Sequence, residues 1–540
     1  MTAARDWFHA IFIDLARQMR WSYLPPLMVY FAAGCSGLTL IVGTFFVKDY
    51  LDLSAAEVAA LAFWAGLPWA LKMPLGHLVD LIWRWKAWLI FLGAGLVGLS
   101  VFIMFLVMTR TEMMQAIMPL RAWYVTSYIL GPCGLVLQDA VADAMSIDAV
   151  PLVHDDGTPV PETEARALHT TMQTLGRFSL IFGTVVVAMV NIAMFSGIDA
   201  MSATDKAQVY ASIYFGALLI PLLSVSGVIL AAWQSAARRR RMMARGMGRA
   251  RIDALLGATG SNTRANPWYF IGGAAFVALS LVVGLGQVPY GQEIIFAGSL
   301  TVVLLLMRQL ISVLTRAQAR TLVGTALIIF VFRATPLPGE GLTWFNIDVL
   351  GFDQQFLSVL ALITSALTLV GMLVLRPMMA RRSIVWIVIM LTLAAGILAL
   401  PNIGLYYGLH EVTAPLTGGV VDARFIAILD TAAESPLGQI AMIPMLAWIA
   451  RSAPRQLKAT FFAVMASFTN LALSAANLLT RYLNEVFVIS REVRDADGSV
   501  NVAADYSQLG LLLILVAVIA VVVPLVTIAM VQASRFRTQE

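Results

Sequence analysis

Two pairs of carboxylates stand where the chain is otherwise apolar. Asp430 and Glu434 are four residues apart in the stretch 423–450, and Asp139 and Asp143 show the same spacing in an earlier stretch. A spacing of four places both acids of a pair on one face of a helix. Carboxylates in an apolar environment bind protons more readily than solvated ones, so both pairs are candidates for proton coupling.

Each pair also has a simpler interpretation. Asp139 and Asp143 are unremarkable if the inner end of their helix already lies at the cytoplasmic surface. Asp430 and Glu434 are solvated if an outer loop reaches deeper than the apolar pattern indicates. The apolar run from Ile440 to Ile449 continues beyond the second pair. This run places the pair in the outer half of a span, with Glu434 nearer the middle.

A cation interrupts a third apolar stretch. Arg177 lies in 167–195, one helical turn after Gln173 and on the same face. Counted from residue 167, Arg177 is about 15 Å along a helix. A cation inside a membrane is costly, and a planar guanidinium binds carboxylates well. Arg177 therefore either binds an anionic substrate or pairs with Asp139 or Asp143, and the pattern leaves both interpretations open.

Two amides stand in a corresponding helix of the second half of the chain. Asn470 and Asn477 lie within the apolar stretch 457–485. Together with Arg177 and Gln173 they are candidates for substrate binding. The alternative is that they hold neighbouring helices together, because amides form hydrogen bonds between membrane helices.

A charged turn joins two apolar stretches and suggests a gate. After Lys72 come Gly76, Asp80, Arg84 and Lys86 at fixed spacing. The pattern G-x-x-x-D-x-x-x-R-x-K resembles the loop between the second and third helices of major facilitator transporters. A small residue lets two helices approach closely, and the acid can hold a basic group or a helix end. We expect these five residues to form an inner gate; the alternative is an ordinary cytoplasmic loop with anchoring cations.

Composition defines the class of protein that positions these residues. Of 540 residues 60% are apolar and only 12% are charged, and the mean hydropathy is +0.83. Soluble domains carry about 25% charged residues. Apolar runs of about 20 residues, long enough to cross a bilayer, recur along the chain. We therefore expect an all-α polytopic membrane protein in an inner or plasma membrane.

Several other functions are not expected. The five His residues have no metal-ligand spacing, and the chain has no phosphate-binding loop. Cys35 and Cys133 both lie in apolar runs, which argues against a disulfide framework. The net charge of +5 is carried by short loops between spans, so nucleic acid is not an expected partner. We expect no metal, no cofactor and no enzymatic activity; the expected partners are a small-molecule substrate, protons and the lipid bilayer.

The apolar runs predict about fourteen transmembrane helices in two six-helix halves with an inserted two-helix hairpin. The expected helices are 26–47, 56–79, 86–108, 116–146, 167–195, 208–233, 268–287, 292–313, 319–334, 355–376, 383–404, 423–450, 457–485 and 508–533. Basic residues gather in every second loop, apart from the acidic loop 148–166, which predicts cytoplasmic N- and C-termini. The outer loops 336–353 and 408–419 carry almost no Lys or Arg.

The same pattern predicts the domain organisation. An interfacial segment 1–25 precedes the first half, 26–233, and the basic linker 234–267 contains Arg238–Arg241. Two related halves around a central path are common in transporters. The expected remaining parts are the inserted hairpin 268–313, the second half 319–533 and a cytoplasmic tail 534–540.

Several strings of residues resemble the folate-biopterin transporter family, within the major facilitator superfamily. They are Phe45-Phe-Val-Lys-Asp-Tyr-Leu51, Leu67-Pro-Trp-Ala-Leu-Lys72, Gln138-Asp-Ala-Val-Ala-Asp143, Pro336-Leu-Pro338, Leu350-Gly-Phe352, Ala441-Met-Ile-Pro444, Pro454 and Ser467-Phe-Thr-Asn470. The strings run through both halves in the family's order. The resemblance implies a major-facilitator-type fold. It also implies a secondary transporter that moves folate, pterin-like or other small organic anions by alternating access, with proton symport.

Two departures keep other functions open. The inserted hairpin 268–313 and the Arg-rich linker are not part of the core family pattern. The Q-D-x-x-x-D string also resembles the muropeptide permease family. The superfamily further contains photosynthetic-complex assembly proteins, which makes a membrane assembly or pigment-handling factor a second class of function.

Overall fold

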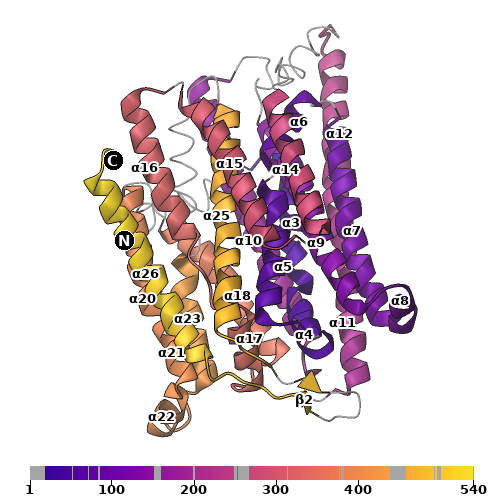
Figure 1. The fold of residues 1–540 in the computed structure, drawn as a ribbon. Coiled ribbons are helices and arrows are strands. Elements are labelled where there is room, and N and C mark those ends of the chain that lie inside the picture. The colour runs from indigo at the N-terminus through magenta and orange to yellow at the C-terminus, as the bar shows by residue number, and fades with distance from the viewer. Residues whose placement is uncertain are drawn as a thin grey trace, which may run out of the picture. The chain divides into compact units, whose positions relative to one another are not determined.

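A computed structural model describes residues 19–51, 53–70, 72–82, 85–150, 160–198, 201–248, 252, 267–286, 288–312, 314–375, 378, 382–437, 458–491, 493–494 and 500–538. These residues form helices and one short two-stranded hairpin (Figure 1). The chain divides into two compact units. Unit 1 comprises Met1–Thr39, Leu75–Val190 and Ala203–Asn266, and unit 2 comprises Leu40–Pro74, Asn191–Ser202 and Pro267–Glu540.

Unit 1 contains the third to sixth expected spans. Its elements are η2 (Trp21–Tyr23), α3 (Leu24–Cys35), η3 (Ser36–Thr39), α7 (Ala87–Thr109), α8 (Thr111–Ile117), α9 (Leu120–Ala149), most of α10 (Glu162–Met194), α11 (Ala203–Ala217) and α12 (Leu219–Ala244). The helix α6 (Lys72–Leu81) begins in unit 2 and continues in unit 1.

Unit 2 contains the second half of the chain together with two early helices. Its elements are α4 (Leu40–Tyr50), α5 (Ala55–Ala70), α14 (Pro267–Leu285), α15 (Gly291–Ile311), α16 (Arg316–Arg333), α17 (Glu340–Asp348), α18 (Gln354–Val374), α20 (Ile384–Leu398), α21 (Leu400–Tyr406), α22 (Leu409–Leu416), α23 (Ala423–Glu434), η5 (Ser435–Leu437), α25 (Lys458–Val486) and α26 (Leu509–Ala533). The antiparallel strands β1 (Val493–Arg494) and β2 (Val500–Val502) follow α25.

The helices coincide with the expected apolar stretches. Among the described residues ten helices are long and apolar enough to cross a membrane, and the shorter apolar helix Phe270–Gly284 lies in the expected hairpin. The all-α polytopic class is therefore confirmed. The number of membrane crossings, the orientation of the termini and the domain boundaries taken from the sequence stay predictions.

Three expected spans are interrupted. The 3₁₀ turn η3 divides the first one into α3 and α4, and the span 383–404 is divided into α20 and α21 just before Pro401. Proline cannot donate the next helical hydrogen bond, which explains a break beside it. In the span 423–450 the α-helix α23 ends at Glu434 and the 3₁₀ turn η5 follows; residues 438–457 lie outside the described residues.

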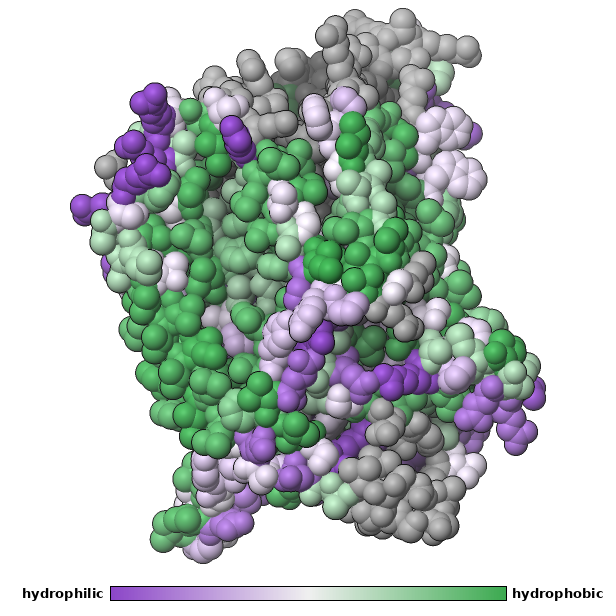
Figure 2. All heavy atoms as spheres, in the orientation of Figure 1, coloured by the Kyte–Doolittle hydropathy of each residue, from purple (hydrophilic) through white to green (hydrophobic). Residues whose placement is uncertain are grey.

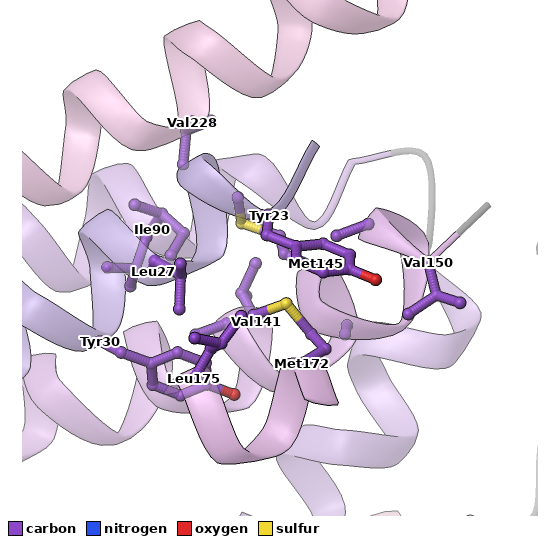
Figure 3. Packing of buried hydrophobic residues seen from close by; sticks show 14 of the residues in the cluster. Tyr23, Leu27, Tyr30, Ile90, Val141, Met145, Val150, Met172, Leu175 and Val228 are labelled. Atoms are coloured by element: carbon purple, nitrogen blue, oxygen red, sulfur yellow. The ribbon is translucent and has the colours of Figure 1, made fainter. Parts of the chain in front are cut away.

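The core of unit 1 is a cluster of buried aliphatic, aromatic and Met side chains. Figure 3 shows Tyr23, Leu27, Ile90, Met145 and Met172 packed together. They come from η2, α3, α7, α9 and α10. Long apolar side chains of this kind fill the space between helices, and Met adapts to irregular gaps. The cluster fixes the faces of α3 and α9 that carry the polar groups described below.

Small residues bring α7 and α9 together. A Cβ built on Gly93 would lie 2.5 Å from the backbone oxygen of Gly134 and 2.9 Å from Cγ of Gln138. The hydroxyl groups of Ser100 and Ser127 each donate to the other residue's backbone oxygen, at 2.7 and 2.9 Å. Small residues and hydroxyl bonds are the usual means of close helix packing in membranes.

The Gly93 contact predicts a selective loss of stability. We expect Gly93→Ala to lower the free energy of unfolding by about 1–3 kcal/mol, because the added methyl group has no space in the α7–α9 interface. Gly95→Ala is the matched control on the same helix, since a Cβ there meets no atom within 4 Å. Thermal unfolding in detergent would check this. Equal melting temperatures for the two variants would contradict the close approach.

Unit 2 is held by helix caps and by packing between early and late helices. Side-chain oxygens of Asp353, Ser383 and Asp422 accept hydrogen bonds at the N-termini of α18, α20 and α23. These caps satisfy backbone N–H groups that helices leave unpaired at their starts. Helix α5 packs along α25, with the side chain of Ser474 beside Gly66.

Apolar side chains cover the outer faces of unit 2. Figure 2 shows a continuous hydrophobic surface over α26 and α20, with hydrophilic groups near the C-terminal end of the chain. The exposed apolar residues of α26 are Leu511, Ile514, Val518, Val522, Val523, Val526 and Met530. A surface of this kind is stable in contact with lipid.

Candidate transport site

The first carboxylate pair faces a tyrosine of α3. The phenol of Tyr30 donates a hydrogen bond of 2.8 Å to Oδ1 of Asp143, and Asp139 interacts electrostatically with the same phenol. Both acids are half-buried on α9, next to the buried Gln138. The i, i+4 spacing therefore places both acids on the face of α9 that packs against α3. The pair is held between helices of unit 1 rather than in a solvated loop.

Arg177 lies in the middle of α10. It is fifteen residues from Glu162 and seventeen from Met194, the ends of this helix, and its side chain is half-buried. The described residues provide Arg177 with no hydrogen bond and no ion pair. Within this part of the chain the guanidinium is thus available to an anion. The side chain of Gln173 lies outside the described residues.

The second carboxylate pair divides into one buried and one exposed acid. Asp430 is 9% exposed, and the amide of Asn402 on α21 donates a hydrogen bond of 2.8 Å to its Oδ2. Its Oδ1 is buried and has no hydrogen-bond partner among the described residues. Glu434 is exposed at the last residue of α23. Within the part of the chain that the structure describes, the low-dielectric environment expected for both acids surrounds Asp430 and not Glu434.

A break in the helix follows this pair directly. Pro436 of η5 packs against Gly371 of α18, where a Cβ would lie 2.5 Å from the backbone oxygen of Pro436. The hydroxyl group of Thr368 donates a hydrogen bond of 3.0 Å to the backbone oxygen of Ser435. Unwound backbone at membrane depth needs such partners, and broken helices often adjoin the ion and substrate sites of transporters. Asp430 lies little more than one turn before this break.

Asn470 and Asn477 lie on α25 of unit 2. They are seven residues apart, which places them on one face of the helix, and both are half-buried. Neither amide has a hydrogen bond to another described residue. Two such amides can bind a polar ligand. Arg177 belongs to the other unit.

The expected gate is only partly described. Lys72 begins α6, Gly76 lies within it, and Lys86 precedes α7. Arg84 and the side chain of Asp80 lie outside the described residues. The close helix approach expected at Gly76 is not found in the described part of the chain, because a Cβ there meets no atom within 4 Å. The close approach is made by Gly93 instead, where backbone faces backbone.

Sequence reasoning missed an ion pair in unit 2. Nζ of Lys48 on α4 lies 2.8 Å from Oδ1 of Asp348 on α17, with both side chains largely buried. The phenol of Tyr506 donates a hydrogen bond of 2.6 Å to the other oxygen of Asp348. Lys48 stands in the first family-like string and had been given no role. It could have been recognised as a cation at the end of a span that the positive-inside rule places outside.

A second contact that the sequence did not predict involves Leu51, three residues after Lys48. Arg491 is 4% exposed and donates a hydrogen bond to the backbone oxygen of Leu51. Its guanidinium also lies 5.1 Å from the ring centroid of Trp344. A buried Arg is stable only where carbonyl or aromatic groups replace its water. With Lys48, Arg491 joins the region after α4 to the second half of the chain.

Acids outside the spans titrate differently from one another. In the segment 336–353, burial raises the pKa of Glu340, which a hydrogen bond with Thr343 partly offsets. After the β-hairpin, hydrogen bonds from Ser507 to the carboxylate of Asp505 lower the pKa of that acid. The two acids have opposite shifts because the first is desolvated and the second is exposed and hydrogen-bonded.

Comparison with known families decides the relationship of the chain. Residues 166–539 match the family described as the BT1 family. The chain belongs to the BT1 family. The chain is also 22% identical to a folate-biopterin transporter of Synechocystis sp., over 86% of this chain and 75% of that protein. The resemblance stated from the strings is therefore confirmed.

Two solved structures with a similar fold are those of transporters. A POT family transporter in complex with a thioalcohol-conjugated peptide has a TM-score of 0.58 at 13% identity, covering 95% of this chain and 96% of that chain. A mutant of the nucleoside transporter NupG has a TM-score of 0.55 at 12% identity, covering 94% of this chain and 99% of that chain. This BT1 family member is thus a multi-pass membrane transporter, and its fold is similar to that of the two solved transporters.

Proposed function

We propose that this protein is a secondary transporter of small organic anions of the folate or pterin type, driven by protons through alternating access. The observation that carries the proposal is Arg177, a half-buried cation in the middle of α10 with no ion pair among the described residues. A cation at such a position is costly unless an anion neutralises it. The relative from Synechocystis sp., named as a folate-biopterin transporter, supports the choice of anion.

In this proposal each candidate residue has a role in the transport cycle. Arg177 binds a carboxylate of the substrate, and the amides of Gln173, Asn470 and Asn477 hydrogen-bond its polar atoms. Asp430 takes up and releases the coupled proton, with Asp139, Asp143 and Glu434 as further proton-binding groups. In the region the positive-inside rule places outside, Lys48 and Asp348 close the path. On the inner side Lys72, Gly76, Asp80, Arg84 and Lys86 form the gate.

A ligand screen tests the substrate class. The purified protein is heated with folates, pterins, muropeptides, nucleotides or tetrapyrroles, and the melting temperature is measured. A ligand at a hundredfold excess over its Kd stabilises the folded state by about 2.7 kcal/mol. We expect stabilisation by folates or pterins, and proton-driven uptake of the same compound into proteoliposomes.

The alternatives predict other outcomes of the same screen. Stabilisation by muropeptides alone would assign the protein to peptidoglycan-fragment transport, which the Gln138–Asp143 string also resembles. Stabilisation by tetrapyrroles without any anion would favour a pigment-handling or assembly factor. Either result would overturn the folate or pterin assignment.

A further inference from the structure

The inserted hairpin contacts an early helix and a late helix of unit 2 at the same time. Its apolar residues Phe276, Val283 and Ile295 form one buried cluster with Phe63 of α5 and Leu478 of α25. Helix α15 packs along α25 (Figure 1). A Cβ on Gly284 would lie 3.0 Å from the indole of Trp64, so the hairpin lies directly against α5.

One polar side chain at the start of α15 bonds both helices. Gln292 is 6% exposed. Its Nε2 donates a hydrogen bond of 3.2 Å to the backbone oxygen of Ala60 on α5. Its Oε1 accepts a hydrogen bond of 3.1 Å from a guanidinium N–H of Arg481 on α25. The amide thus uses its donor on one helix and its acceptor on the other.

Several polar contacts join the hairpin to α25, whereas a single polar bond, from Gln292 to Ala60, joins it to α5 among the described residues. Arg481 also lies 3.7 Å from Glu293 and 2.7 Å from Glu485. The phenol of Tyr482 donates a hydrogen bond to Glu293. Figure 2 shows hydrophilic side chains gathered on this face, where the turn between α14 and α15 lies. The hairpin therefore has its charged contacts on α25, and it contacts α5 through the amide of Gln292 and through the apolar cluster around Phe63.

The turn before Gln292 is strained in a way that supports a fixed role. Tyr290 has φ of 56°, the only positive value for a non-glycine residue among those described. A bulky residue in this left-handed region is strained and persists where surrounding contacts impose it. The ring of Tyr290 is exposed, so its own burial does not explain the strain. The conformation starts α15 at Gly291 and places Gln292 between the two helices.

We infer that the inserted hairpin is a brace between the two halves of the transporter, and that Gln292 is the residue that closes it. By sequence α5 belongs to the first six-helix half and α25 to the second. Alternating access moves one half against the other, so a step that separates α5 from α25 breaks the bond to Ala60 while the hairpin stays on α25. The brace stabilises the conformation described here and lowers the population of the opposite one. This inference rests on the proposed alternating access.

Distance measurements between spin labels test the brace without measuring transport. The labels are placed at Met113→Cys on α8 and Val488→Cys after α25, both exposed residues, in a chain carrying Cys35→Ala and Cys133→Ala. Gln292→Met removes both bonds with little change in length. Gln292→Glu keeps the acceptor for Arg481 and removes only the donor to Ala60. Ser299→Ala is the matched control, because that buried hydroxyl bonds only its own helix, at Ile295.

We expect the longer-distance population, relative to the shorter one, to rise about 3- to 20-fold in both Gln292 variants, as one interhelical hydrogen bond in a membrane predicts. Ser299→Ala is expected to leave the ratio unchanged. An unchanged ratio in both Gln292 variants, with two populations present, would refute the brace and leave the transport proposal intact. A single fixed distance in all proteins and conditions would refute both the brace and alternating access.

Discussion

Arg177→Ala is expected to weaken folate or pterin binding by about 10- to 100-fold, because a hydrogen bond to a charged group contributes roughly 1.5–3 kcal/mol. Stability without ligand is expected to stay the same or rise. Arg177 has no ion pair or hydrogen bond among the described residues, so its removal leaves no described group unpaired. The melting temperature with and without ligand measures both effects in one experiment.

Two further variants separate charge from geometry. Arg177→Lys keeps the positive charge and loses the planar fork, so it should restore only part of the affinity. Arg238→Ala removes the same charge from an exposed position at the end of α12 and should change neither affinity nor stability. A loss of stability in ligand-free Arg177→Ala would show that the guanidinium holds the fold together. A folate shift of undiminished size would refute its role in binding.

The helices could be predicted from the sequence because many residues in each one are apolar. Each apolar run of about 20 residues reports a span independently of its neighbours. The breaks could not be predicted in the same way. At Ser435-Pro436, where α23 gives way to η5, Pro436 packs against Gly371, a residue far away in the sequence, and Thr368 donates a hydrogen bond to the backbone oxygen of Ser435. Such partners become visible only when the helices are packed.

The residue types of the candidate site could be predicted from the sequence, but the groups that surround each residue could not. Spacing of four correctly placed Asp139 and Asp143 on one face of α9, but Tyr30, the group they face, comes from α3. The apolar pattern placed Glu434 nearer the middle of the span than Asp430, but Asp430 is the buried acid and Glu434 is exposed. Only packing distinguishes them, because α23 ends at Glu434 and Asn402 covers Asp430.

Lys and Arg residues in the regions that the positive-inside rule places outside carry information that the hydropathy pattern does not use. The positive-inside rule disfavours Lys and Arg there, so each one that remains needs a reason. Lys48 pairs with Asp348, Arg424 lies 3.4 Å from Asp353, and Arg481 lies between two glutamates. All of these pairs lie in unit 2. The Lys and Arg residues that depart from the positive-inside rule therefore indicate contacts that hold the helix ends of unit 2 together.

Asp430→Asn is expected to abolish proton-driven accumulation of the substrate. Asp430 is buried, one of its oxygens has no partner among the described residues, and the helix breaks just beyond it. A carboxylate in this position can take a proton in one conformation and release it in the other, whereas an amide cannot. Asn402 can still bond the amide oxygen of the variant, so the fold should be retained.

Uptake into proteoliposomes measures the accumulation ratio of the substrate, for which an expected value can be given. With the membrane potential abolished, one coupled proton and a gradient of one pH unit support about tenfold accumulation, since one unit corresponds to 1.36 kcal/mol. We expect that ratio to fall to about one in Asp430→Asn. Exchange of labelled for unlabelled substrate should continue, because exchange requires no net proton movement. Glu434→Gln tests the second acid of the pair, and because Glu434 is exposed this variant should retain most of the accumulation. Full accumulation by Asp430→Asn, or its loss in Glu434→Gln alone, would place the coupled proton on another acid.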